Sequence, residues 1–203
     1  MSRDRYSLSF TAASLYINPS IDAAKLYLET NDWDLVKSEF IGQNMLQSRT
    51  TSALRRTTGE LIPRLQTLST AELQFFVECS PSEQGYILWI AICRRYAFIA
   101  DLTLEVIADR VATLMLTFDH ADFDAFYQSK ALQHPELDAV SDLTRKKLRE
   151  VSFRMLREAG LLTKKNDILE PILSGRFIAE MSQGPGVGVS VLPSRYLNSL
   201  GGK

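Results

Sequence analysis

The sequence has few of the residues that build disulfide scaffolds, metal centres or membrane spans. Its 203 residues include two cysteines and two histidines. Cys79 and Cys93 both lie in apolar helical patterns, which indicates buried thiols in a reducing compartment and favours a cytoplasmic location. The most apolar run, Tyr86 to Cys93, ends at two arginines and is far shorter than the ~20 residues that cross a bilayer. We therefore expect no disulfide scaffold and no association with a membrane.

Catalytic motifs are missing as well. The phosphate-binding patterns GxxxxGK[ST] and GxGxxG do not occur, and neither does the GxSxG nucleophile motif. His120 and His134 have no Cys or His at ligand spacing. The acidic cluster that begins at Asp119 lacks the glycine and terminal glutamate of a calcium loop, so helix capping explains it better. We expect a protein that is not an enzyme and has no catalytic residues, metal or cofactor.

Charge is unevenly distributed along the chain although its total is only -1. Residues 1–66 contain eight Lys and Arg against seven Asp and Glu, which leaves +1. Residues 67–140 contain four against eleven, which leaves -7, and residues 141–203 contain eleven against six, which leaves +5. Any binding of nucleic acid must therefore depend on local basic clusters and not on total charge.

Apolar residues recur every three or four positions from about Ser20 to Met181, which predicts an all-α fold, a compact bundle of several helices. Residues with N-capping side chains mark the expected helix starts: Asp32, Ser48, Ser69, Ser80, Asp119 and Ser141. Pro135 separates the acidic middle from the basic last third. The predicted organisation is an N-terminal helical lobe over 1–135, a basic helical module over 136–181 and a flexible Gly/Pro-rich tail over 182–203.

The first basic segment runs from Ser48 to Leu68. At 100° per residue its leucines form one stripe, and three arginines fall on the opposite side with a fourth at the stripe's edge: Arg49, Arg56 and Arg64 opposite, Arg55 at the edge. Arginine side chains suit phosphate oxygens, so this helix is a candidate for contact with DNA. Pro63 is expected to bend or break the helix. The alternative is a solvated helix whose arginines pair with the acidic middle.

The second basic segment runs from Ser141 to Ala159. Its outward side carries Lys146, Lys147, Arg154 and Arg157, with glutamates interleaved among these cations. Gly160 is expected to end this helix in a left-handed conformation. Two short apolar runs follow, separated by a polar turn beside Lys164 and Lys165. A long helix, a glycine and a tight hairpin with lysines at its tip is the order of a winged-helix module, whose wing contacts phosphates. A surface turn that joins two helices is the alternative.

Several of these segments together resemble a known family. They are Tyr6–Leu15, Arg49–Arg56, Arg64–Leu65, Met155–Leu162 and Pro171. Their order and spacing are similar to the BrxA family, a small non-enzymatic component of bacteriophage exclusion (BREX) defence systems. The similarity covers about residues 5–178.

The resemblance implies a fold similar to that of the NusB antitermination protein. It also implies that the chain is a non-catalytic accessory protein, which binds double-stranded DNA and works with other BREX subunits. We expect it to be monomeric on its own. Contacts to the DNA backbone are assigned to eight residues: Arg49, Arg55, Arg56, Arg64, Lys146, Lys147, Lys164 and Lys165. The alternatives are a protein–protein scaffold within the defence complex, whose acidic middle docks a basic partner, or a NusB-like protein that binds RNA.

Overall fold

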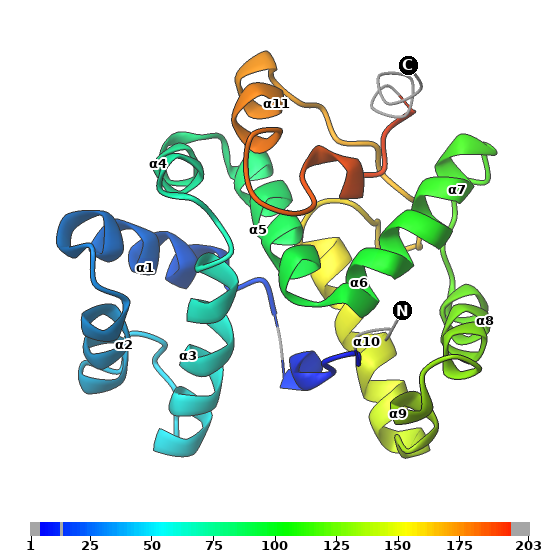
Figure 1. The fold of residues 1–203 in the computed structure, drawn as a ribbon, viewed down its shortest axis with the longest axis horizontal. Helices are drawn as coiled ribbons and strands as arrows, with labels where there is room; N and C mark the ends of the chain where they lie inside the picture. The colour runs from blue at the N-terminus through cyan, green and yellow to red at the C-terminus, as the bar shows by residue number, and fades with distance from the viewer. Residues whose placement is uncertain (1–4, 13, 196–203) are drawn as a thin grey trace.

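The computed structural model describes residues 5–12 and 14–195 and confirms the all-α prediction (Figure 1). The α-helices are α1 (Ile17–Thr30), α2 (Trp33–Gly42), α3 (Thr51–Leu65), α4 (Thr70–Glu78), α5 (Pro81–Arg95), α6 (Ala97–Leu102), α7 (Ala108–Ala112), α8 (His120–Ala131), α9 (Pro135–Asp138), α10 (Asp142–Glu158) and α11 (Gly175–Met181). A π-helix, η2 (Thr103–Ile107), joins α6 to α7. Two 3-10 helices, η1 (Ser9–Ala12) and η3 (Val189–Val191), lie near the two ends of the described chain.

Side-chain caps start most of the helices where the sequence predicts them. Ser69 and Ser80 form complete capping boxes with Glu72 and Glu83. The Asp32, Asp119 and Ser141 side chains also accept backbone N–H groups at their helix starts. The predicted cap at Ser48 is wrong, because the cap of α3 is Thr50, whose hydroxyl accepts the Ala53 N–H. Helix α3 also continues through Pro63 and ends at Leu65.

Helix α5 is the centre of the hydrophobic core. Its residues from Gln84 to Cys93 are all buried, including Trp89. A helix that is apolar on every side is stable only when other elements surround it. Helices α3, α4, α6 and α10 pack against it, as does η3. The apolar run therefore belongs to the core, and no helix in the described ranges is long and apolar enough to cross a membrane.

The elements that position the candidate site are α3, η1 and α10. In Figure 1, α3 lies between α2 and α10, and η1 packs against both α3 and α10. The hydrophobic core continues across the predicted boundary at Pro135, since Phe40, Trp89 and Phe153 belong to one cluster of buried residues. The division into two lobes and a tail stays a prediction.

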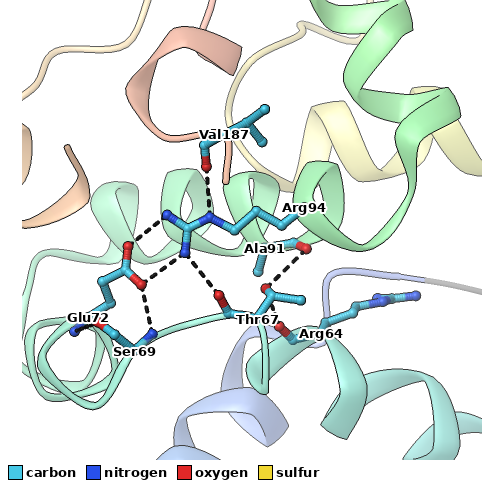
Figure 2. Close-up of polar contacts among 7 residues, drawn as sticks. All are labelled: Arg64, Thr67, Ser69, Glu72, Ala91, Arg94 and Val187. Atoms are coloured by element: carbon cyan, nitrogen blue, oxygen red, sulfur yellow. Dashed lines mark hydrogen bonds and ion pairs between the residues drawn. The ribbon is translucent and has the colours of Figure 1, made fainter. Parts of the chain in front are cut away.

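The C-terminal segment is attached to the core through Arg94, as Figure 2 shows. The Arg94 guanidinium donates to the carbonyl oxygens of Val187 (2.7 Å) and Thr67 (3.0 Å) and pairs with both carboxylate oxygens of Glu72 at 2.7 and 2.9 Å. The Glu72 carboxylate also accepts the Ser69 N–H. One buried ion pair thus connects α4, α5 and the segment that precedes η3. Residues 196–203 of the predicted tail lie outside the described residues.

Candidate nucleic-acid interface

Helix α10 presents its basic side chains on the side opposite the core. Leu148, Val151 and Met155 are buried, as the sequence predicts. At 100° per residue, Lys146 and Lys147 fall within the outward sector, and both are exposed. The apolar pattern of the helix therefore determines which cations reach the solvent.

A groove brings a basic residue of α3 opposite the cations of α10. It has a volume of 730 Å³, and its basic lining residues are Arg56, Lys146, Lys147 and Arg154. Arg56 is 90 residues away from Lys146 in the sequence. The two basic segments therefore meet on one exposed side of the molecule, although only part of each contributes.

Two of the basic residues in this groove have no partner within the fold. Arg56 and Lys146 form no ion pair or side-chain hydrogen bond with any residue in the described ranges. Lys147 pairs with Glu150 at 3.5 Å, but both side chains are more than half exposed, so the pair is weak and easily exchanged for a phosphate contact. The groove has one carboxylate among its lining residues, Glu150, against four cations.

Other basic residues of α10 are occupied within the fold. Arg149 pairs with Asp124 of α8, and Arg145 pairs with Asp142 at 3.5 Å. Arg157 at the last turn donates to Asn166 Oδ1 at 2.7 Å. These contacts attach α10 to its neighbours, so Arg145, Arg149 and Arg157 are held by the fold.

The predicted hairpin follows α10 directly. Gly160 has the expected left-handed conformation (φ 72°), and Leu162 forms an antiparallel bridge with Ile168. Thr163 N donates to Asp167 O at 2.9 Å, and Asn166 adopts a positive φ of 69° in the turn. This turn exposes the two lysines assigned from the sequence, Lys164 and Lys165.

A third segment pairs with the hairpin. Thr117, between α7 and α8, forms an antiparallel bridge with Asp167. The chain order is therefore helix α7, an extended segment at Thr117, helices α8, α9 and α10, and then a hairpin that pairs with that segment. Within the described ranges these contacts are isolated bridges and no strand forms. The hairpin predicted after Gly160 is therefore present, and the comparison with a winged-helix module stays a prediction.

Arg64 is the clearest correction to the predicted site. The helical wheel places it with the outward arginines, but it is only 3% exposed. Its guanidinium donates to Ser14 O at 2.8 Å and lies over the Tyr96 ring. The segment that follows η1 covers this side of the last turn of α3, so Arg64 cannot contact DNA. In Figure 2 its side chain points away from the Arg94 cluster.

The remaining assigned arginines lie outside the groove. Arg49 and Arg55 are exposed, but neither lines it. Arg49 precedes the N-cap of α3, so it lies outside the helix in which the sequence predicted it. Conversely, Arg154 lines the groove and was not among the assigned residues. Its signal was present in the sequence, because Arg154 is seven residues after Lys147 and therefore on the same side of α10.

The acidic cluster at the start of α8 acts as a helix cap. Asp119 Oδ1 accepts the N–H groups of Asp122 and Ala121, and these hydrogen bonds lower the pKa of the Asp119 carboxyl. This confirms the capping interpretation of the cluster. In the part of the chain that the structure describes, no group of three or more His, Cys, Asp or Glu side chains is placed to hold a metal ion.

Comparison with known proteins gives one family and one fold. The BrxA family model matches residues 4–183. "BREX protein BrxA" of Escherichia coli is 25% identical over 137 residues, which are 68% of this chain and 64% of that protein, so the chain spans just under two thirds of this relative. "BREX protein BrxA" of Bacillus cereus is 23% identical over 161 residues, which are 77% of this chain and 80% of that protein.

A solved structure shares the fold. The crystal structure of an uncharacterized protein from Magnetospirillum magneticum matches with a TM-score of 0.77 and 21% sequence identity. The match covers 89% of this chain and 93% of that chain. This likeness bears on the arrangement of the helices alone.

Proposed function

The chain belongs to the BrxA family, and from that premise we propose that it is a non-catalytic accessory protein of a BREX phage-defence system that binds double-stranded DNA through the groove between α3 and α10. Other BREX subunits are the expected partners, and we propose a monomer in the cytoplasm. Both cysteines are free thiols, as suits that compartment.

The groove is the observation that carries this proposal. Arg56 from α3 faces Lys146 and Lys147 from α10, and Arg56 and Lys146 have no carboxylate partner among the described residues. Unpaired cations on an exposed helix side attract phosphates, since binding releases the counterions condensed on DNA. Among the described residues that line the groove, Glu150 is the one carboxylate that opposes this attraction.

The hairpin extends the basic surface along the helix. From Lys146 to Arg157 the helix advances eleven residues, about 16 Å, which is close to five base-pair rises of about 3.4 Å. Arg157 contacts the hairpin turn, and Lys164 and Lys165 lie exposed in that turn. A duplex that contacts the groove and the turn together meets phosphates several base pairs apart. Such contacts position the protein on DNA and do not select a sequence.

Salt dependence gives this proposal a magnitude. Four phosphate contacts, two of them from Lys146 and Lys147, predict a slope of about -3.6 for log K against log salt concentration. Affinity for DNA then falls roughly 150-fold between 50 and 200 mM salt. Removing two of the contacts reduces the slope by about 1.8. The slope measures the number of contacts directly, which the affinity alone does not.

The test is fluorescence anisotropy with a labelled 20-base-pair duplex at several salt concentrations. The variant Lys146→Gln/Lys147→Gln is expected to bind more weakly and to show the smaller slope. Its matched control is Lys25→Gln/Lys37→Gln, which removes the same charge from exposed positions on α1 and α2. Equal midpoints and equal slopes for the two double variants would exclude the groove as the DNA site.

Two further measurements test the hairpin and the RNA-binding alternative. Lys164→Gln/Lys165→Gln tests whether the hairpin contacts phosphates, and the expected result is again a smaller salt slope. A single-stranded RNA of equal length tests the NusB-like alternative. Preference for RNA would point to base stacking on exposed aromatic side chains, whereas aromatics do not line the groove.

A further inference from the structure

A second groove, between α1 and α2, has the opposite charge. It has a volume of 430 Å³, and its charged lining residues are Asp22, Glu29, Glu39 and Lys25. The segment from Ile17 to Leu46 as a whole contains five Asp and Glu against two Lys, which leaves -3. In Figure 1 these two helices lie on the far side of α3 from α10. The two grooves therefore belong to different sides of the molecule.

The carboxylates of this groove are not neutralised by the fold. None of the four charged lining side chains takes part in an ion pair within the described ranges. Glu39 accepts a hydrogen bond from the Gln43 side chain, and no cation contacts it there. An anionic rim of this kind repels phosphates, so this groove is not part of a DNA surface.

The floor of the groove is apolar. Leu26 and Met45 are half-buried, and Leu35 is 41% exposed on the outer side of α2. The flexible methionine side chain adapts to varied apolar partners. An apolar floor with an acidic rim is the surface that a basic amphipathic helix fits.

The length of the groove also suits a helix. Its lining residues on α1 run from Asp22 to Glu29, and those along α2 run from Leu35 to Gln43, the residue that caps its C-terminus, so each wall extends over about two helical turns, or about 12 Å. On both helices the lining positions are three or four residues apart, which makes the ridges that pack against a third helix.

We propose that the α1–α2 groove docks a basic amphipathic helix of a partner protein, with apolar side chains against Leu26, Leu35 and Met45 and lysines or arginines against the carboxylate rim. This goes beyond the proposed DNA binding and does not depend on it. The rim gives association that is faster and more selective for basic partners, and the floor gives most of the affinity.

The test uses a labelled 14-residue peptide with leucines at positions 4, 7, 8 and 11 and lysines on either side of them. Anisotropy at 50 mM salt is expected to show saturable binding to the whole protein. Glu29→Gln/Glu39→Gln is expected to weaken it about three- to thirtyfold, and Leu35→Ala about fivefold. The control Asp109→Asn/Glu180→Gln removes the same charge from two acids outside the groove that form no ion pair with the described residues, and it is expected to bind as wild type.

Three results would overturn the proposal. The first is equal peptide affinity in the Glu29/Glu39 variant and its control. The second is equal binding of a peptide with glutamate in place of every lysine. The third is self-association of the wild-type protein, measured by light scattering, that Leu35→Ala abolishes, because a second copy then occupies the groove. DNA binding measured on the same Glu29/Glu39 variant is expected to stay at wild-type strength, so failure here is separate from failure of the DNA site.

Discussion

The buried pair of Arg94 and Glu72 allows a demanding test of how the fold is held together. Their side chains are 4% and 2% exposed, and Arg94 also satisfies the carbonyls of Thr67 and Val187. Replacing Arg94 with methionine keeps an unbranched apolar stem, which is shorter than arginine, and removes all of the donors. The Glu72 carboxylate then stays buried without a counterion, and two carbonyl oxygens lose their partner.

The expected loss follows from these contacts. Breaking a buried ion pair on one side costs about 3–5 kcal/mol, because one charge remains uncompensated. For a chain of this size a loss of about 4 kcal/mol lowers the melting temperature by roughly 8–16 °C. With a urea m-value of about 2 kcal/mol/M, the unfolding midpoint falls by about 2 M. Circular dichroism at 222 nm follows the transition, since the fold is helical.

A double-mutant cycle measures the interaction energy between Arg94 and Glu72 apart from the other contacts of each side chain. Glu72→Met/Arg94→Met removes both charges, so we expect it to lose about 2–3 kcal/mol less than the sum of the two single variants. The control is Arg176→Met, which breaks the exposed pair with Glu78 and is expected to cost at most about 1 kcal/mol. An Arg94→Met variant as stable as the Arg176 control, or a cycle without coupling, would refute this reasoning.

Three other predictions concern thiols, acid and a helix end. Burial raises the pKa of the Cys79 thiol to about 12 and also raises that of Cys93. The native protein at pH 8 should therefore react only slowly with a thiol reagent, and rapid modification of one thiol per protein would contradict this. Hydrogen bonds from Arg195 lower the pKa of Glu170, so its contribution to stability is present above pH 4.5 and is lost as the pH falls through the lowered value. The urea unfolding midpoint of Glu170→Gln should therefore fall less on acidification than that of wild type. If the midpoints of the two proteins fall in parallel as the pH is lowered, Glu170 makes no such contribution. Gly160 has φ 72°, so Gly160→Ala should cost about 1 kcal/mol of unfolding free energy, whereas an unchanged midpoint would mean that the αL conformation is not required.

The sequence predicts the local features of this fold well. The apolar period of α10 places Lys146 and Lys147 outward because its inward residues pack on the core as a continuous stripe. The caps at Ser69 and Asp119 depend on contacts within four residues, which a sequence contains in full. The start of α3 was missed because Ser48 and Thr50 are both good caps, and nothing local decides between them.

Features that depend on distant segments could not be predicted in the same way. Arg64 has the spacing of a solvent-facing residue, and only the chain near Ser14, fifty residues earlier, buries it. The Arg94–Glu72 pair joins residues 22 apart and needs a third segment at Val187. The meeting of Arg56 with α10 likewise follows from how η1 packs between the two helices. Helical periodicity gives the side of a helix, but not what covers it.

The net charge of the chain is near zero, although two grooves of opposite charge lie on different sides of α3. Helix α3 contributes Arg56 to the basic groove and packs against α2, a wall of the acidic one. Its buried side, at Leu54, Leu61 and Leu65, belongs to the interior, so we expect α3 to act as a rigid wall and not as an element with two arrangements. Coupling of two sites through a change of shape requires such an element. We therefore expect the duplex and the basic peptide to bind independently, each with the same affinity whether or not the other is present. Their simultaneous binding would still raise the local concentration of a basic partner at DNA, without any change of shape. A shift of more than about threefold in either affinity on saturation with the other ligand would show that α3 moves.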